Sequence, residues 1–274
     1  MKLIQQSHIV TPHRGFLAAV IVAASSLTGV ITNSANAAVT TFFGEDANVG
    51  EANRLLVHPL SDAARANFLS SLVGVGTETF ESFADGTVLP LVLNFPGSVG
   101  GITATLSGSG FVDVLPGVGT NGAGRYPISG THYLDGVNAS TGGTALTINF
   151  SSQIAAFGFY GTDIGDFNGT IELRLSGAVV STVNVGNSTG NAGAGVLFFG
   201  VIDNVNTFDQ VIFRNTGSGS DVFGFDDMTI GDLQQVIPPG PGTAVPEPGS
   251  ALTGLLAAGL CLGRFTARRR QSKQ

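Results

Sequence analysis

Residues 170–175 read Thr-Ile-Glu-Leu-Arg-Leu, and polar and apolar side chains alternate along all six positions. Successive side chains of a β-strand point to opposite faces of the sheet. The pattern therefore predicts that Ile171, Leu173 and Leu175 are buried while Glu172 and Arg174 face water. A strand of this kind belongs to an antiparallel sheet with one buried and one solvated face.

Similar short runs, rich in β-branched and aromatic residues, lie on both sides of this segment between glycine-rich turns. The predicted strands are 77–83, 88–95, 102–106, 111–115, 144–150, 154–160, 170–175, 179–185, 196–202, 208–213 and 222–230. So many strands joined by short turns indicate an all-β fold, an antiparallel β-sandwich. We expect a jelly-roll-like topology, because two large packed sheets limit the number of exposed edges.

One helix is predicted before the strands. Ser61 and Asp62 can cap a helix that runs to residue 72 and places several apolar side chains on one face. These side chains are Ala64, Phe68, Leu69 and Leu72. We therefore expect an N-terminal extension with a short helix at 38–76, a β-sandwich domain at 77–232 and a Pro/Gly linker at 233–245.

The N-terminus has the features of a secretory signal peptide, predicted at 1–37. A basic start precedes an apolar run at 16–31, and Ala35 and Ala37 occupy the positions read by signal peptidase. Cleavage is predicted before Ala38. The alternative is an N-terminal membrane anchor that stays uncut.

The C-terminus carries a second address, predicted at 246–274. Pro246-Glu247-Pro248 precedes an apolar helix at 250–267, which is marginally long enough to span a membrane. The basic residues that follow or end this helix are expected on the cytoplasmic side. They include Arg264, Arg268, Arg269 and Arg270.

This order of elements closely resembles the PEP-CTERM sorting signal of exported bacterial proteins. The resemblance covers about the last 30 residues and implies that an exosortase removes the tail near Pro246 to Pro248. It also implies an association with bacteria that make extracellular polysaccharide. The alternative is an ordinary C-terminal transmembrane anchor. Cys261, the single cysteine, lies in this helix as a packing residue or, alternatively, a lipidation site.

Charge is distributed unevenly along the chain. The whole chain has a formal charge of −7. Residues 38–245 contain five arginines, no lysine and 18 acidic residues, a formal charge of −13. This segment would repel phosphate, so nucleic acid is excluded as a partner.

The strand region is also similar to PEP-CTERM ectodomains and, more distantly, to jelly-roll carbohydrate-binding and MAM-like modules. Phe80-Glu81, residues 156–163 and residues 223–230 carry this similarity. In such modules a first-strand glutamate and a last-strand aspartate often hold a structural calcium, which implies a site at Glu81 with Asp226 or Asp227. Alternation would give one aspartate a largely apolar face, so we expect a partner or a bulge there. The alternative is that these carboxylates accept hydrogen bonds from loop amides.

A second acidic cluster contains Asp163 and Asp166. Asp166-Phe167-Asn168 begins like an EF-hand loop, but Thr170 stands where the next ligand belongs. Aspartate, asparagine and glycine at this density favour a turn over a calcium site.

Catalytic patterns are weak in this sequence. Residues 117–122 match G-x-G-x-x-G, but no helix follows to bind a pyrophosphate, so the match is rejected. No H-E-x-x-H helix occurs, the exported region offers no cysteine nucleophile, and we expect no enzyme activity. Tyr126, Tyr133 and Tyr160 are candidate sugar-stacking residues, although a tyrosine at a strand end is more often a core residue.

These patterns together predict a non-catalytic, acidic protein exported by bacteria. It would be held in the inner membrane by its C-terminal helix until exosortase acts, and would then function at the cell surface or in the extracellular matrix. The runner-up is a carbohydrate-binding module that recognises extracellular polysaccharide. The third interpretation is a glycoside or other hydrolase.

Overall fold

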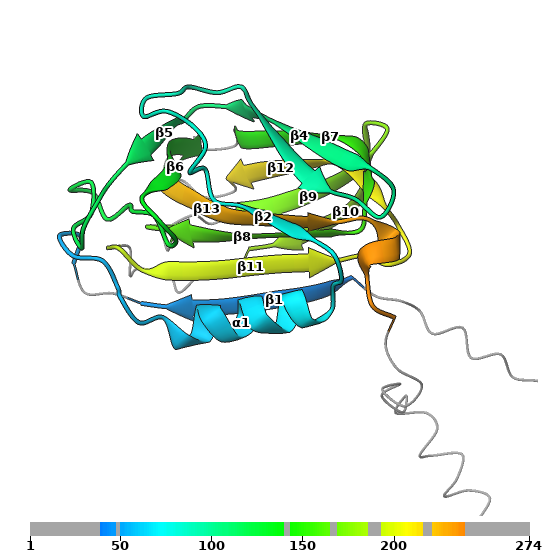
Figure 1. The fold of residues 1–274 in the computed structure, drawn as a ribbon, viewed down its shortest axis with the longest axis horizontal. Helices are drawn as coiled ribbons and strands as arrows, with labels where there is room; N and C mark the ends of the chain where they lie inside the picture. The colour runs from blue at the N-terminus through cyan, green and yellow to red at the C-terminus, as the bar shows by residue number, and fades with distance from the viewer. Residues whose placement is uncertain are drawn as a thin grey trace, which may run out of the picture. The chain divides into compact units, whose positions relative to one another are not determined.

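The computed structural model describes residues 39–47, 50–139, 143–164, 169–185, 193–215 and 221–238. They form two antiparallel sheets and one α-helix, so the predicted β-sandwich is confirmed (Figure 1). The residues predicted as signal peptide and as sorting signal, and most of the predicted linker, lie outside this described part of the chain. Across the described ranges, no helix combines the length and hydrophobicity needed to cross a membrane.

Sheet 1 has seven strands in the order β1-β11-β8-β13-β6-β5, with β2 paired to the far part of β13. All its pairings are antiparallel. Its strands are β1 (Thr40–Asp46), β2 (Gly76–Glu78), β5 (Phe111–Val114), β6 (His132–Ala139), β8 (Ala156–Thr162), β11 (Val196–Ile202) and β13 (Asp221–Gly231).

Sheet 2 has six antiparallel strands in the order β10-β9-β12-β7-β4-β3. The predicted alternation is confirmed at 171–174, because Ile171 and Leu173 are fully buried and Glu172 and Arg174 face outward, whereas Leu175 is only half-buried. The strands are β3 (Leu91–Pro96), β4 (Gly101–Gly108), β7 (Thr144–Ile154), β9 (Gly169–Leu175), β10 (Ala178–Asn184) and β12 (Phe208–Asn215).

Two predicted strands are shorter than the sequence indicates. The strand predicted at 77–83 ends at Glu78, because Phe80 takes a left-handed backbone conformation with φ of 60°. The strand predicted at 88–95 begins at Leu91, directly after Pro90, which has no N–H for a sheet ladder. Strands β1 and β6 were not predicted.

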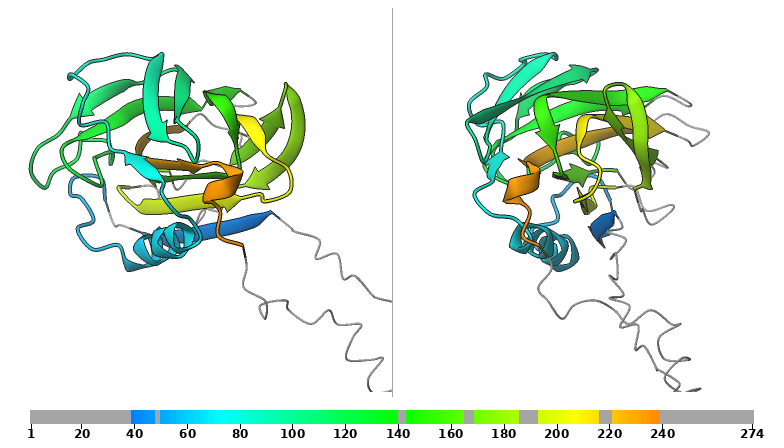
Figure 2. Two further views of the ribbon diagram at one scale, coloured as in Figure 1. Left: turned by 45° about the vertical axis from the view of Figure 1, so that its right-hand side comes forward. Right: turned by 90° about the vertical axis from the view of Figure 1, so that its right-hand side faces the viewer.

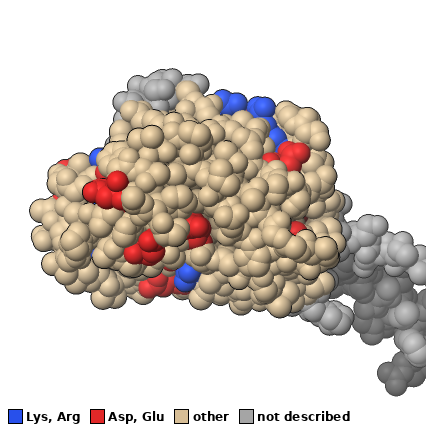
Figure 3. All heavy atoms as spheres, turned by 45° about the horizontal axis from the view of Figure 1, so that its top comes forward, with Lys and Arg blue, Asp and Glu red and all other residues tan. Residues whose placement is uncertain are grey.

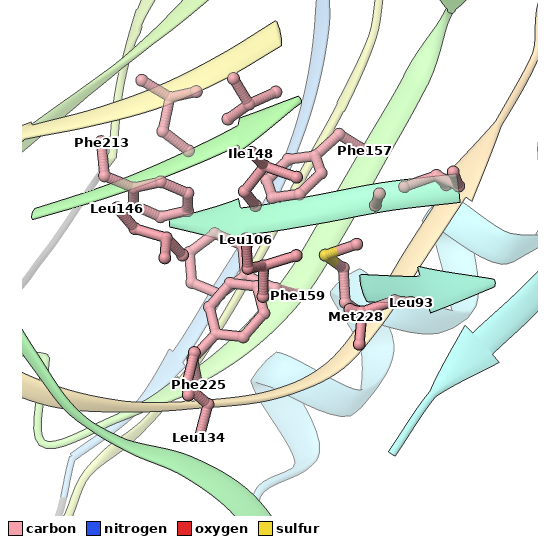
Figure 4. Close-up of a cluster of buried hydrophobic side chains, with 14 of the residues drawn as sticks. Leu93, Leu106, Leu134, Leu146, Ile148, Phe157, Phe159, Phe213, Phe225 and Met228 are labelled. Carbon is pink, nitrogen blue, oxygen red and sulfur yellow. The ribbon is translucent and has the colours of Figure 1, made fainter. Parts of the chain in front are cut away.

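The main core lies between the two sheets and is rich in phenylalanine (Figure 4). Phe159 of β8 stacks on Phe225 of β13, with ring centroids 4.8 Å apart, and Phe213 of β12 contacts both rings edge-on. Rings from both sheets therefore interlock at the centre of the domain, and edge-to-face contacts add to the burial of apolar area.

Helix α1 (Pro59–Ser70) covers the outer face of sheet 1 beside β1 and β11 (Figures 1 and 2). The helix starts at Pro59, two residues earlier than predicted. Its cap is also different: the Asp46 carboxylate of β1 accepts hydrogen bonds from the amides of Leu60 (3.1 Å) and Ser61 (2.8 Å). A carboxylate at this end is favoured by the helix dipole and by the otherwise unpaired amides.

The apolar face of α1 packs on a floor made by two glycines. Phe68 is fully buried there, in a second core between the helix and sheet 1. A methyl group on Gly158 of β8 or on Gly200 of β11 would lie 2.8 Å from the Phe68 ring. These two positions therefore require glycine so that the helix can approach the sheet.

The domain boundaries differ from the predicted ones. The region predicted as an N-terminal extension contributes β1, which pairs with β11 along its whole length. At the other end, residues predicted as linker form a short 3-10 helix, η1 (Leu233–Gln235), and the amide of Ile237 donates to Ser71 of the α1 end. The sandwich therefore extends from β1 to at least Ile237.

Replacing either floor glycine should destabilise the domain. We expect Gly200→Ala and Gly158→Ala each to reduce the free energy of unfolding by about 1–3 kcal/mol, because Phe68 must shift in a packed core. Thermal unfolding followed by circular dichroism measures the effect. Gly101→Ala is the matched control, since its nearest neighbour would be 3.7 Å from the new methyl. Equal melting temperatures for all three variants would contradict this account of the helix contact.

Candidate functional site

A β-bulge in β13 positions the two aspartates that the sequence marked as possible metal ligands. The pairing of β13 with β8 shifts between Asp226 and Thr229, and Asp227 has a left-handed φ of 50°. Phe225 and Met228, on either side, both belong to the main core. The extra residue therefore keeps both carboxylates out of the core, as the predicted bulge requires.

Each aspartate has protein partners on the outer side of sheet 1. Asp226 accepts hydrogen bonds from the amides of Ile128 (2.7 Å) and Ser129 (3.1 Å). Asp227 accepts one from the Ser129 hydroxyl (2.5 Å), and the Arg65 guanidinium lies 3.4 Å from its other oxygen. The two carboxylates thus hold the loop that precedes β6 against β13.

Burial dominates the electrostatics of this pair. It raises the pKa of Asp226 well above its usual range, and the neighbouring Asp227 carboxyl raises it further. Burial also raises the pKa of Asp227, although the Ser129 hydroxyl and Arg65 act in the opposite direction. A buried carboxyl with such a shift is a common feature of functional sites, but structural networks produce it as well.

The bulge is linked to α1 through Tyr160 and Asp62, to which the sequence assigned other roles, and through His58 and Arg65, which it did not single out. The Tyr160 hydroxyl donates to Asp62 (2.7 Å), and His58 Nδ1 lies 2.9 Å from the same carboxylate oxygen. The Arg65 guanidinium lies over the Tyr160 ring as well as beside Asp227. His58, Asp62 and Arg65 are spaced by four and three residues, so the sequence could have placed them on one face of the helix. It could not have shown that this face meets β8 and β13.

Glu81 does not join the aspartates. Its carboxylate accepts hydrogen bonds from the amides of Thr131 (2.6 Å) and His132 (2.7 Å), and the His132 ring lies 2.9 Å away. Burial acts to raise its pKa, but these hydrogen bonds outweigh that effect and hold the pKa below its usual value. Glu81 and Asp226 therefore bind successive parts of one loop.

Glu81, Asp226 and Asp227 do not form the arrangement that a calcium ion requires. Calcium needs six to eight oxygen ligands, whereas these carboxylates accept amide hydrogens and, at Asp227, face a guanidinium. Within the described ranges, no group of three or more His, Cys, Asp or Glu side chains could hold a metal ion. The geometry favours the alternative, in which the carboxylates bind loop amides.

The second acidic cluster is described in part. Asp163 accepts a hydrogen bond from the amide of Gly193 (3.1 Å) and lies 3.7 Å from Arg125. Asp166 falls outside the described residues. Asp163 also has a φ of 54°, a conformation typical of turns.

The three tyrosines are core residues rather than sugar-stacking residues. Each is at most 2% exposed, and each hydroxyl has a partner inside the domain. Tyr126 donates to the Ala194 carbonyl (2.8 Å), Tyr133 to Asp113 (2.9 Å) and Tyr160 to Asp62. Burial raises the pKa of Tyr126 to about 12. Their predicted role in ligand binding is therefore wrong.

A different surface is available for binding, which we call the open face. It is the outer face of sheet 2, opposite the main core, and the described helix lies on the other sheet (Figures 1 and 2). Most of its side chains carry hydroxyl or amide groups. They include Asn94, Thr103, Thr105, Ser107, Thr147, Asn149, Ser151, Thr170, Thr182, Asn184 and Gln210.

Charge is sparse on the open face. Figure 3, which brings the β4 and β7 side of the domain forward, shows charged side chains in small separate groups on a mostly uncharged surface. The outward residues of sheet 2 include two arginines and one glutamate. Glu172 of β9 is the glutamate, and it lies between Arg214 of β12 (2.5 Å) and Arg174 (2.7 Å). Most of the acidic residues of segment 38–245 therefore lie outside the open face.

The comparisons with known proteins identify no family for this chain. No protein-family model and no curated protein matches it. A structural search returned the K2 cleaved adhesin domain of Lys-gingipain, which is 13% identical and covers 57% of this chain and 97% of that domain. The TM-score of this likeness is 0.34.

The amide-binding role of Asp226 can be separated from metal binding. We expect Asp226→Ala to lower the free energy of unfolding by about 1–3 kcal/mol, because two loop amides lose their acceptor. The loss should be the same with EDTA and with added calcium, measured by thermal unfolding. EDTA should also leave the wild-type melting temperature unchanged. A drop in wild-type stability on chelation, absent in Asp226→Ala, would establish a metal site instead.

The Glu172 ion pairs should make stability depend on pH. The hydrogen bonds from Arg214 and Arg174 hold the pKa of Glu172 below its usual value. Their contribution to the free energy of unfolding is therefore fully present above the unfolded-state pKa, near 4.3, and is lost as pH falls through the lower folded-state pKa. Glu172→Gln should therefore be less stable than wild type by about 1 kcal/mol at pH 7. Urea unfolding should show that this gap closes under more acidic conditions. A gap that is constant with pH would contradict an ionic role.

Proposed function

We propose that this chain is an exported bacterial protein, displayed at the cell surface or in the extracellular matrix by a non-catalytic β-sandwich. In this proposal signal peptidase removes residues 1–37, and the C-terminal helix anchors the protein in the inner membrane. Exosortase then recognises Pro246-Glu247-Pro248 and removes the tail. The resemblance of that tail to a PEP-CTERM signal is the sequence argument for this route.

One structural observation carries the proposal: both ends of the sandwich lie at the same corner. Thr40 at the start of β1 and Ile237 after η1 line one shared hollow, together with Ser71 at the end of α1. In Figure 1 the chain enters and leaves the domain at this corner. A domain connected in this way can be tethered through its C-terminal linker while the outer face of sheet 2, which α1 does not cover, stays accessible.

The side-chain chemistry of the bulge agrees with a non-catalytic role. Asp226, Asp227, Ser129 and Arg65 bond to one another or to loop amides, and these bonds connect α1, β13 and the loop before β6. The polar groups of these four residues therefore stabilise the fold. We also propose that the sandwich is jelly-roll-like, since its consecutive strands cross repeatedly between the two sheets.

Processing of the tail tests the proposal. Replacing Pro246, Glu247 and Pro248 by alanine should leave a full-length precursor in the inner membrane, because exosortase would lose its recognition site. Immunoblots of membrane and extracellular fractions would detect it. Pro238→Ala with Pro239→Ala is the matched control, because it changes prolines of the same linker outside the motif and should leave processing normal. Normal processing of the first variant would overturn the sorting assignment.

A further inference from the structure

We propose that the open face of sheet 2 binds a neutral polysaccharide chain. This inference goes beyond surface display, and it assigns a ligand class to a surface distinct from the buried tyrosines. It rests on the proposed export only in that an extracellular domain meets such polymers.

The centre of the open face is a row of hydrogen-bonding side chains in register across three strands. Thr105 of β4 is paired with Asn149 of β7, and Asn149 is paired with Gln210 of β12. The Gln210 side-chain nitrogen donates to the Asn149 carbonyl oxygen at 2.7 Å, which fixes both amides. Each amide has two donors and a carbonyl, so this bond leaves the Asn149 nitrogen and the Gln210 carbonyl for a ligand.

A second row lies two residues along β4 and β7, on the same face of the sheet. Asn94 of β3 is paired with Thr103 of β4, and the Ser151 hydroxyl of β7 accepts a hydrogen bond from the Thr103 amide at 2.9 Å. Hydroxyl and amide groups both donate and accept, as sugar hydroxyls do. Six strands about 4.8 Å apart give a face about 24 Å wide, which accommodates several sugar rings.

The charge of the face favours a neutral polymer. Of the 18 acidic residues and five arginines in residues 38–245, one glutamate and two arginines lie on the open face, and these three are paired with each other. These three residues sum to a formal charge of +1, both arginines are already held by Glu172, and the two central rows contain no charged side chain. An anionic polymer would meet little local attraction and an acidic domain around it, whereas an uncharged polymer avoids that repulsion.

A protein partner suits this face less well. Stable protein interfaces have an apolar centre enriched in aromatic residues and methionine. The outward side chains described for sheet 2 contain none of these. Ile212, the aliphatic residue of the outward side of β12, is only 7% exposed, and the exposed Val92 and Val179 lie on the edge strands β3 and β10. The centre of the face is polar, which matches a hydroxyl-rich ligand.

The test is affinity electrophoresis of the full chain in mild detergent. Native gels would contain galactomannan, hydroxyethyl cellulose or dextran as neutral probes, and polygalacturonate as the anionic one. We expect at least one neutral polymer to slow migration, with an affinity that changes little between low and high salt because no ion pairs form.

Matched variants locate the binding surface. Thr103→Val with Thr105→Val removes two hydroxyls from the open face and keeps the β-branched shape, so binding should weaken about tenfold. Thr40→Val with Thr41→Val makes the same change on exposed residues of β1 and should leave affinity unchanged. Melting temperatures would confirm that both variants fold.

Three results would overturn the inference. They are no retardation by any neutral polymer, equal binding by the two double variants, and binding to polygalacturonate alone that high salt abolishes. None of these results bears on exosortase sorting, which the processing of the Pro-Glu-Pro variant tests separately.

Discussion

The contact between Phe68 and the two floor glycines determines how the rest of the domain is arranged. Because Gly158 and Gly200 let the ring approach the backbone of β8 and β11, α1 can bury its apolar face on sheet 1. Asp46 fixes the start of the same helix from β1. One sheet is therefore covered on its outer side, and the polar outer surface of the other remains available to solvent and ligands.

The acidic residues of this domain serve two different purposes. Asp46, Asp226 and Glu81 accept hydrogen bonds from backbone amides that have no partner in a sheet. Asp46 thereby positions the start of α1, and the other two position the loop before β6. Glu172 instead pairs with arginines on the outer face of sheet 2. These carboxylates thus connect segments that lie far apart in the sequence.

The sequence predicted the parts of the fold that depend on local pattern. Alternation identified β9, and runs of β-branched residues located most other strands. Strand β6 was missed because Asp135, Gly136 and Asn138 are turn formers, and it is held by pairing with β5 and β13. The roles of Asp46 and Asp226 depend on partners far along the chain, so spacing could not reveal them. Tyr160 was misassigned for the same reason.

The pairing of the arginines has a consequence for resistance to proteolysis. Trypsin-like proteases cleave after lysine or arginine, and residues 38–245 contain no lysine. Four of the five arginines are held by carboxylates, and Arg54 donates to the carbonyls of Gly119 and Leu115. Cleavage needs several residues of extended, accessible chain, which these sites offer only after local unfolding. The folded domain is thereby protected from proteases that cleave after lysine or arginine.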